Sequence, residues 1–287
     1  MTTARVIVTR PARDAVQWVQ QLQQTGIAAE AFPLIDIAPL SSVASAQALH
    51  TAWQAMDDYA ACMFVSGHAV EQFFKQNTAL AQAGWAQAAI NNVANPAVLN
   101  FPPNVRFMAP GPGTVAALLA AGVPAAQVDA PLPDARQFDS ESLWQVVGPR
   151  DWQGRRVLIE RGQNVDGPGN SSGRDWIASQ WRAAGAQVDF VGAYQRLPPV
   201  LSEAQVQRAR QAGGDGSVWL FSSSEAVANL CQMAGLQDMD WRHARAVATN
   251  PRIADAVRAA GWGVVVESRP ALNDIRQTLG SIELPHP

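Results

Sequence analysis

Two stretches of the sequence decide how the chain is organised: Glu30–Leu40, EAFPLIDIAPL, and Asp189–Pro199, DFVGAYQRLPP. Each begins four residues after a glycine, Gly26 in the first case and Gly185 in the second. Both stretches contain proline, which breaks the interior of a helix and holds the preceding residue away from the helical region. We therefore expect two extended segments that occupy equivalent places in two copies of one pattern.

The sequence around these two stretches repeats as well. Arg5–Arg10 (RVIVTR) resembles Arg156–Arg161 (RVLIER), and Phe64–Val70 (FVSGHAV) resembles Phe221–Val227 (FSSSEAV). If each copy starts in one domain and finishes in the other, the two extended stretches are the crossings. This predicts one domain of residues 1–36 plus 199–287, a second of residues 37–198, a two-stranded linker, and a ligand cleft between the domains. Two sequential domains that divide near residue 150 are the alternative that the pattern leaves open.

Short apolar runs alternate with helical stretches along most of the chain. Runs rich in β-branched residues predict strands at Val6–Thr9, Ala60–Ser66, Val105–Ala109, Arg156–Glu160, Val188–Val191, Ser217–Phe221, Ala244–Ala248 and Gly263–Glu267. Helices are expected at Ala12–Thr25, Ala69–Gln76, Thr114–Ala121, Arg174–Ala184 and Ile253–Ala260. Glycine follows several of these helices, as it does where a helix ends in a left-handed residue. The predicted fold class is α/β, with two parallel-sheet domains related by the repeat.

Composition limits the classes of partner. The chain has 287 residues, a net charge of −3 and only 16% charged residues, so it lacks the basic surface that general nucleic-acid binding needs. Its four histidines are scattered without the spacing of metal ligands, so we expect no metal site. No apolar run is long enough to cross a membrane, and the first residues do not form a signal peptide. We expect a cytoplasmic monomer that binds no nucleic acid and no membrane.

A series of short motifs follows the predicted strands in order along nearly the whole chain. The motifs are Val8–Pro11 (VTRP), Phe32–Ile35 (FPLI), Phe64–Ser66 (FVS), Gly111–Thr114 (GPGT), Asp139–Leu143 (DSESL), Leu158–Gly162 (LIERG), Ala193–Arg196 (AYQR), Phe221–Ser224 (FSSS) and Thr249–Ile253 (TNPRI). In their order and spacing, the motifs resemble those of the uroporphyrinogen-III synthase family. The resemblance implies two domains joined by a two-stranded linker. Two segments depart from the family's pattern because they look expanded, residues 84–104 and the loop Gln163–Gly173.

The resemblance also implies a reaction. The substrate would be hydroxymethylbilane, a linear tetrapyrrole with eight carboxylates. Loss of its hydroxyl as water gives an azafulvene, and a spiro intermediate then inverts ring D to give uroporphyrinogen III. In the family, a tyrosine at the place of Tyr194 faces the cleft and assists departure of the hydroxyl, so Tyr194 is the catalytic candidate. A phenol can donate a proton or a hydrogen bond to a leaving oxygen. The structural alternative is a linker tyrosine that packs the hinge.

Further candidates bind the substrate carboxylates, because hydroxyls, backbone N–H groups at helix starts and arginine forks all suit anions. They are Thr9, Arg10, Ser66, Gly113, Thr114, Arg161, Gly162, Arg174, Ser222, Ser223, Thr249 and Arg252. For the serines the alternative is plain capping of helices. The turn Gly111–Thr114 could mimic a dinucleotide fingerprint, but it has Ala116 where the third glycine would stand. A two-domain module that binds an anionic ligand without turnover is the competing function.

Overall fold

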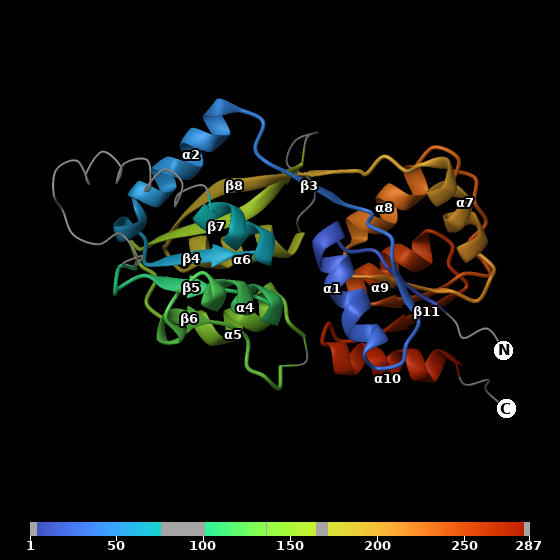
Figure 1. Cartoon of the computed structure of the whole chain (residues 1–287). Coiled ribbons are helices and arrows are strands. Elements are labelled where there is room, and N and C mark those ends of the chain that lie inside the picture. The colour runs from blue at the N-terminus through green and yellow to red at the C-terminus, as the bar shows by residue number, and fades with distance from the viewer. Residues whose placement is uncertain (1–4, 76–100, 136, 165–171, 284–287) are drawn as a thin grey trace. The chain divides into compact units, whose positions relative to one another are not determined.

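The structure is a computed structural model that describes residues 5–75, 101–135, 137–164 and 172–283 of the chain (Figure 1). Within these ranges, the side chains of residues 164, 172–174 and 283 are not described. The chain divides into two compact units. Unit 1 combines Met1–Ile37 with Leu197–Pro287, and unit 2 is Ala38–Arg196.

Unit 1 is built on a five-stranded parallel sheet whose strand order is β11-β10-β9-β1-β2. Its strands are β1 (Val6–Val8), β2 (Ala29–Ala31), β9 (Val218–Phe221), β10 (Arg245–Ala248) and β11 (Val264–Glu267). The N-terminal strand β1 lies between β2 and β9, with Val6 opposite Val218 and Val8 opposite Leu220. The first residues of the sequence and the last third therefore share one sheet.

Helices cover both faces of this sheet, as the buried apolar strands require. They are α1 (Ala12–Gln23), α7 (Glu203–Ala212), α8 (Ser224–Gln232), α9 (Pro251–Ala259) and α10 (Leu272–Glu283). On one face α1 and α10 pack on Val6, Val8 and Leu220. These two helices lie next to each other in Figure 1. On the other face α7, α8 and α9 enclose Trp219 and Phe221. Alternate residues of β1 and β9 therefore face two separate cores.

The second sheet has six strands of order β3-β8-β7-β4-β5-β6, in which β8 to β6 run parallel, and it belongs to unit 2 except for most of β3 and the last residue of β8. Its strands are β3 (Asp36–Ala38), β4 (Ala61–Phe64), β5 (Arg106–Met108), β6 (Val128–Asp129), β7 (Arg156–Asn164) and β8 (Gln187–Leu197). The predicted crossing segments contain β3 and most of β8, which are neighbours in this sheet. The predicted α/β class, with two domains built on parallel sheets, is confirmed.

The helices of unit 2 again lie on both faces of the sheet. They are α2 (Val43–Gln54), a helix of residues 67–75, α4 (Pro112–Ala120), α5 (Ser140–Val147) and α6 (Ser172–Ala183). One face packs α5 and α6 against Ala61, Met63 and Ile159, with Trp181 fully buried between them. The opposite face carries an aromatic cluster in which the Phe64 ring lies 5.5 Å from Phe73 and 6.4 Å from Phe107. In Figure 1, α2 and α5 lie on opposite sides of these strands.

The local signals in the sequence identify most elements but not all of their ends. Gly26, Gly122, Gly185 and Gly261 have φ of 81°, 90°, 88° and 94°, so the predicted glycine caps are confirmed. The strands β2 and β6 were not expected, because two or three residues are too few to show an alternating pattern. The strands β7 and β8 extend beyond the predicted ranges to Asn164 and Leu197, because they continue to pair with each other there. Among the described residues, no helix is long and apolar enough to cross a membrane.

Candidate functional site

Polar residues follow the carboxyl ends of the strands in both units, where parallel sheets hold their ligands. In unit 2, Ser66 follows β4 and begins the helix of residues 67–75. Its Oγ accepts a hydrogen bond from the backbone N–H of Ala69 at 3.1 Å. Capping, the structural role that the sequence suggested for this serine, is therefore present. The cap occupies one acceptor site of the Ser66 hydroxyl, which keeps a second acceptor site and its hydrogen for other partners.

One of these partners is Tyr194. Its Oη lies 3.0 Å from Ser66 Oγ, although the two residues are 128 positions apart in the sequence. Tyr194 is only 2% exposed, whereas Ser66 is partly exposed. The structure thus joins two predicted site residues in a hydroxyl pair at the carboxyl end of the sheet.

Gly162 gives the Tyr194 ring its place on the sheet. A Cβ atom at position 162 would lie 2.6 Å from Cε2 of Tyr194 and 2.9 Å from Cδ of Arg196. Only a residue without a side chain leaves room for the ring in this position. The sequence predicts that Gly162 binds substrate. The structure shows that Gly162 makes room for the Tyr194 ring.

Arg161 lies on the opposite face of β7 from Gly162. Its guanidinium stacks 4.4 Å from the centre of the Phe190 ring and lies 3.5 Å from Asp175 Oδ1 on α6. Neighbouring residues of a strand point to opposite faces, so Arg161 and Tyr194 do not share a face. Arg161 is therefore held on the face of β7 that packs against α6, away from the Ser66–Tyr194 pair.

Glu160 is a feature of this strand that the sequence analysis missed. Its side chain is fully buried, and neither carboxylate oxygen has a hydrogen-bond partner among the described residues. Burial raises the pKa of Glu160 well above its ordinary value. It lies on the face of β7 that carries Gly162, opposite Phe64 of β4. A glutamate that directly follows the apolar run Val157–Ile159, within the same predicted strand, was the signal that could have identified it.

The turn Gly111–Thr114 starts helix α4 and contains two more predicted residues. Gly111 is the N-cap, and neither Gly111 nor Gly113 has an atom within 4 Å of an added Cβ. There is therefore open space on the side of both glycines where a side chain would stand. Thr114, by contrast, is 6% exposed and donates its backbone N–H to Gly111 O at 3.1 Å. The start of the helix of residues 67–75 is close, since a Cβ at Gly67 would lie 3.7 Å from Gly113 O.

In unit 1, Thr9, Ser223 and Thr249 follow three neighbouring strands and lie at the carboxyl end of the sheet. Thr9 Oγ1 donates to Leu220 O at 2.8 Å, and the backbone N–H of Thr249 donates to Phe221 O at 3.1 Å. Both threonines are buried and flank the end of β9. Ser222 follows, and Ser223 caps α8 by accepting from Glu225 N at 3.2 Å. The hydroxyl hydrogen of Thr9 is thus already used within the protein.

Arg10 also lies at this carboxyl end, two residues after β1. Its guanidinium lies 4.4 Å from the centre of the Trp18 ring, and its buried Nε has no hydrogen-bond partner among the described residues. Burial lowers the pKa of Arg10, and Asp14 offsets part of this effect. A guanidinium keeps its charge in such surroundings, so Arg10 offers a fixed positive group at the carboxyl end of the sheet.

The remaining predicted residues are less closely involved. Arg252 is exposed in the first turn of α9, which Asn250 caps by accepting from the Arg252 N–H at 2.9 Å. The Arg174 side chain lies outside the described residues, as do most of the loop 163–173 and residues 84–100 of the expanded segment. In the described part of the chain, no group of three or more histidine, cysteine, aspartate or glutamate residues is placed to hold a metal ion.

Comparisons with known proteins give one consistent result. The sequence family described as uroporphyrinogen-III synthase HemD matches residues 16–276. A mutant uroporphyrinogen III synthase of the extremely thermophilic bacterium Thermus thermophilus superimposes with a TM-score of 0.55 at 17% identity, covering 97% of this chain and 98% of that one. The uroporphyrinogen-III synthetase of Helicobacter pylori gives a TM-score of 0.52 at 11% identity, covering 98% and 100%. At sequence identities this low, the structural similarity shows a shared fold alone.

Proposed function

Because this chain belongs to the uroporphyrinogen-III synthase family, we propose that it closes the linear tetrapyrrole hydroxymethylbilane to uroporphyrinogen III. The family consists of cyclising lyases of heme biosynthesis. The observation that carries the proposal is the family match over residues 16–276, which spans both units. We also propose that the protein acts in the cytoplasm as a monomer and needs neither metal nor cofactor.

The chemistry requires a leaving group to depart and one ring to be inverted. The bond between carbon and the terminal hydroxyl breaks with its electron pair on oxygen, which leaves as water after gaining a proton. Loss of a pyrrole N–H proton completes the azafulvene, which the distal pyrrole attacks through its substituted carbon to form the spiro intermediate. Fragmentation and reclosure give the type III isomer. The hydroxyl pair of Ser66 and Tyr194 supplies hydrogen-bonding groups suited to the departing oxygen.

Binding of the eight carboxylates falls to groups at the strand ends of the two units. In unit 1 we propose Thr9, Arg10, Ser222, Ser223, Thr249 and Arg252, and in unit 2 Ser66, Gly113, Thr114, Arg161, Gly162 and Arg174. Support comes from the helix starts at Ser66, Gly111 and Ser223, whose backbone N–H groups favour anions. Positioning of the ends of a long substrate supplies much of the rate acceleration in such a reaction.

The first experiment is an isomer analysis. Purified protein is supplied with hydroxymethylbilane without metal or nucleotide, and the uroporphyrin isomers are separated after oxidation. Spontaneous closure gives type I, so a predominantly type III product is expected from the enzyme. Only type I, formed at the uncatalysed rate, would overturn the proposal and leave an anion-binding module.

Replacing Tyr194 by phenylalanine removes one hydroxyl and keeps the ring over Gly162. We expect kcat to fall about 3- to 10-fold with KM nearly unchanged, since one hydrogen bond to the reacting region is lost. The matched control is Tyr59→Phe. Tyr59 Oη donates to Asp189 at 3.0 Å and accepts from Arg156 at 3.2 Å at the amino end of β8, so this variant loses stability but not kcat. An unchanged kcat in Tyr194→Phe would remove Tyr194 from the reaction.

Replacing Arg10 by glutamine removes the fixed positive charge at the end of β1. Charge-assisted hydrogen bonds contribute about 1.5–3 kcal/mol, so we expect KM to rise about 10- to 100-fold with a smaller change in kcat. Steady-state kinetics with hydroxymethylbilane provide the measurement. Arg155→Gln is the control, because Arg155 is exposed at the amino end of β7. Equal KM values in the two variants would show that Arg10 does not bind substrate.

A further inference from the structure

The two hydroxyls of the Ser66–Tyr194 pair are not equivalent in their surroundings. Tyr194 is 2% exposed, its ring lies against the backbone of Gly162, and the Ser66 hydroxyl is its hydrogen-bond partner among the described residues. Ser66 is partly exposed at the start of a helix. A ligand that approaches the carboxyl end of this sheet therefore reaches the Ser66 hydroxyl more easily than the Tyr194 hydroxyl.

The distance between the two hydroxyls allows either to donate, and the hydrogen-bond capacity of Ser66 Oγ favours one direction. A serine hydroxyl has two acceptor sites and one donor, and the N–H of Ala69 occupies one acceptor site. A phenol is a better donor than an alcohol, so the Tyr194 O–H fills the second acceptor site. The Ser66 O–H is then left to donate, and no partner for it exists among the described residues.

From this arrangement we infer that Ser66 is the hydroxyl that contacts the departing oxygen of the substrate, and that Tyr194 is a positioning residue that acts through Ser66. Both hydrogen bonds to Ser66 Oγ polarise its O–H and strengthen it as a donor. The Ala69 N–H adds the positive end of the helix of residues 67–75. Ser66 donates a hydrogen bond only, so no proton has to be restored to it after each turnover.

This inference rests on the proposed function and assigns the order of the two groups within it. If Ser66 makes the contact, removal of its hydroxyl disables both groups, whereas removal of the Tyr194 hydroxyl weakens a donor that remains. We expect kcat to fall about 10- to 100-fold in Ser66→Ala and about 3- to 10-fold in Tyr194→Phe. The double variant should equal Ser66→Ala, since Tyr194 has no independent path to the substrate.

The experiment measures kcat, KM and the type III fraction for the two single variants and the double variant. A larger loss in Tyr194→Phe than in Ser66→Ala would overturn the inference, and so would a double variant whose loss is the product of the single losses. Either result would make Tyr194 the contact. A wild-type protein that forms only type I would instead overturn the proposed function, so the two failures are distinguishable.

Three further variants separate this role from helix capping. Ser66→Thr keeps the hydroxyl and should retain most of kcat, so a loss as large as in Ser66→Ala counts against the inference. Ser66→Gly also removes the hydroxyl, at a position where glycine is tolerated as a cap. If the alanine variant folds poorly, Ser66→Gly replaces it and should show the loss of kcat expected for Ser66→Ala. Ser202→Ala removes the cap of α7 and should lower Tm by about 2–4 °C with kcat unchanged.

Discussion

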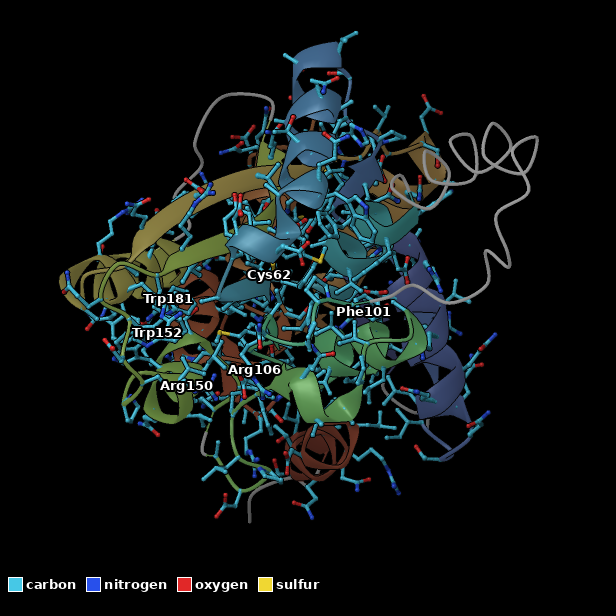
Figure 2. The ribbon with its side chains drawn as sticks, turned by 90° about the vertical axis from the view of Figure 1, so that its left-hand side faces the viewer. Cys62, Phe101, Arg106, Arg150, Trp152 and Trp181 are labelled. Carbon is cyan, nitrogen blue, oxygen red and sulfur yellow. The ribbon has the colours of Figure 1, made fainter. Side chains whose placement is uncertain are left out.

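Replacement of Asp129 by asparagine is expected to lower the free energy of unfolding by about 2–3 kcal/mol. Asp129 is 7% exposed and receives two arginines at once. Arg106 donates to Oδ1 at 2.6 Å and to Oδ2 at 3.0 Å, and Arg150 donates to the same atoms at 2.8 and 2.5 Å. Figure 2 shows the two arginines close together. An amide in place of the carboxylate leaves two adjacent cations with a neutral acceptor, and partial exposure of both arginines limits the loss.

The pH dependence of this effect has a definite sign. Burial alone would raise the pKa of Asp129, but the hydrogen bonds and charges of Arg150 and Arg106 outweigh it and leave the pKa lowered. The stabilisation is therefore complete above the unfolded-state pKa of about 3.9 and is lost as the pH falls through the folded-state value. Denaturant unfolding at pH 7 and at about pH 3 measures it, with the exposed Asp134→Asn as control. Equal stabilities of Asp129→Asn and the wild type at pH 7 would contradict the prediction.

The fold was predictable where its signals are local. The glycines after α1, α4, α6 and α9 mark helix ends because their left-handed backbone excludes most other residues. The apolar runs of β9 and β10 show strands that are buried on both faces. The strand β2, Ala29–Ala31, carries no such signal, because a glutamate occupies one of its three positions. Its place in the sheet comes from pairing with β1.

The site was less predictable because its residues meet through pairing across the sheet. Counting from Asp189 by alternation places Ala193 on the face of Val191 and Tyr194 on the opposite one. In the structure Gly192 pairs with Arg161 and Tyr194 pairs with Gly162, so Ala193 is an extra residue in β8. This bulge turns Tyr194 to the face of Val191 and brings it to Ser66. A bulge depends on the partner strand, so the sequence of β8 alone does not reveal it.

The alternating direction of the side chains along β7, by contrast, could be predicted from the sequence. Glu160 and Gly162 must share a face, and Arg161 must point to the other. The structure follows this rule, with Arg161 against Phe190 and Gly162 beneath Tyr194. The motif Leu158–Gly162 supplied both Arg161 and Gly162 as candidates, and only alternation along the strand assigns them to different faces.

Glu160 leads to the second prediction with a large effect, in which a substitution should stabilise the protein. Its carboxyl group is fully buried beside the apolar Phe64 and lacks a hydrogen-bond partner among the described residues. Burial raises its pKa well above the ordinary value, and the same carboxyl group adds to the effect of burial in raising the pKa of Cys62. The folded protein therefore keeps Glu160 protonated over a pH range in which the unfolded chain ionises it.

The consequence for stability follows from this difference in proton binding. The contribution of Glu160 is most favourable below the unfolded-state pKa of about 4.3. It falls by about 1.4 kcal/mol for each pH unit above that value, until the folded protein ionises as well. Glu160→Gln removes the ionisation and keeps the shape. The variant should therefore be more stable than the wild type at pH 7, and its advantage should vanish near pH 4.

Denaturant unfolding of both proteins between pH 4 and pH 8 tests this prediction, because the difference in free energy should grow steadily with pH. Glu203→Gln is the control, since Glu203 is exposed in the first turn of α7 and its loss should cost a few tenths of a kcal/mol at every pH. A constant difference between wild type and Glu160→Gln would show that the carboxyl group has the same proton affinity in both states. That result would require a partner for Glu160, and residues outside the described ranges would have to supply it.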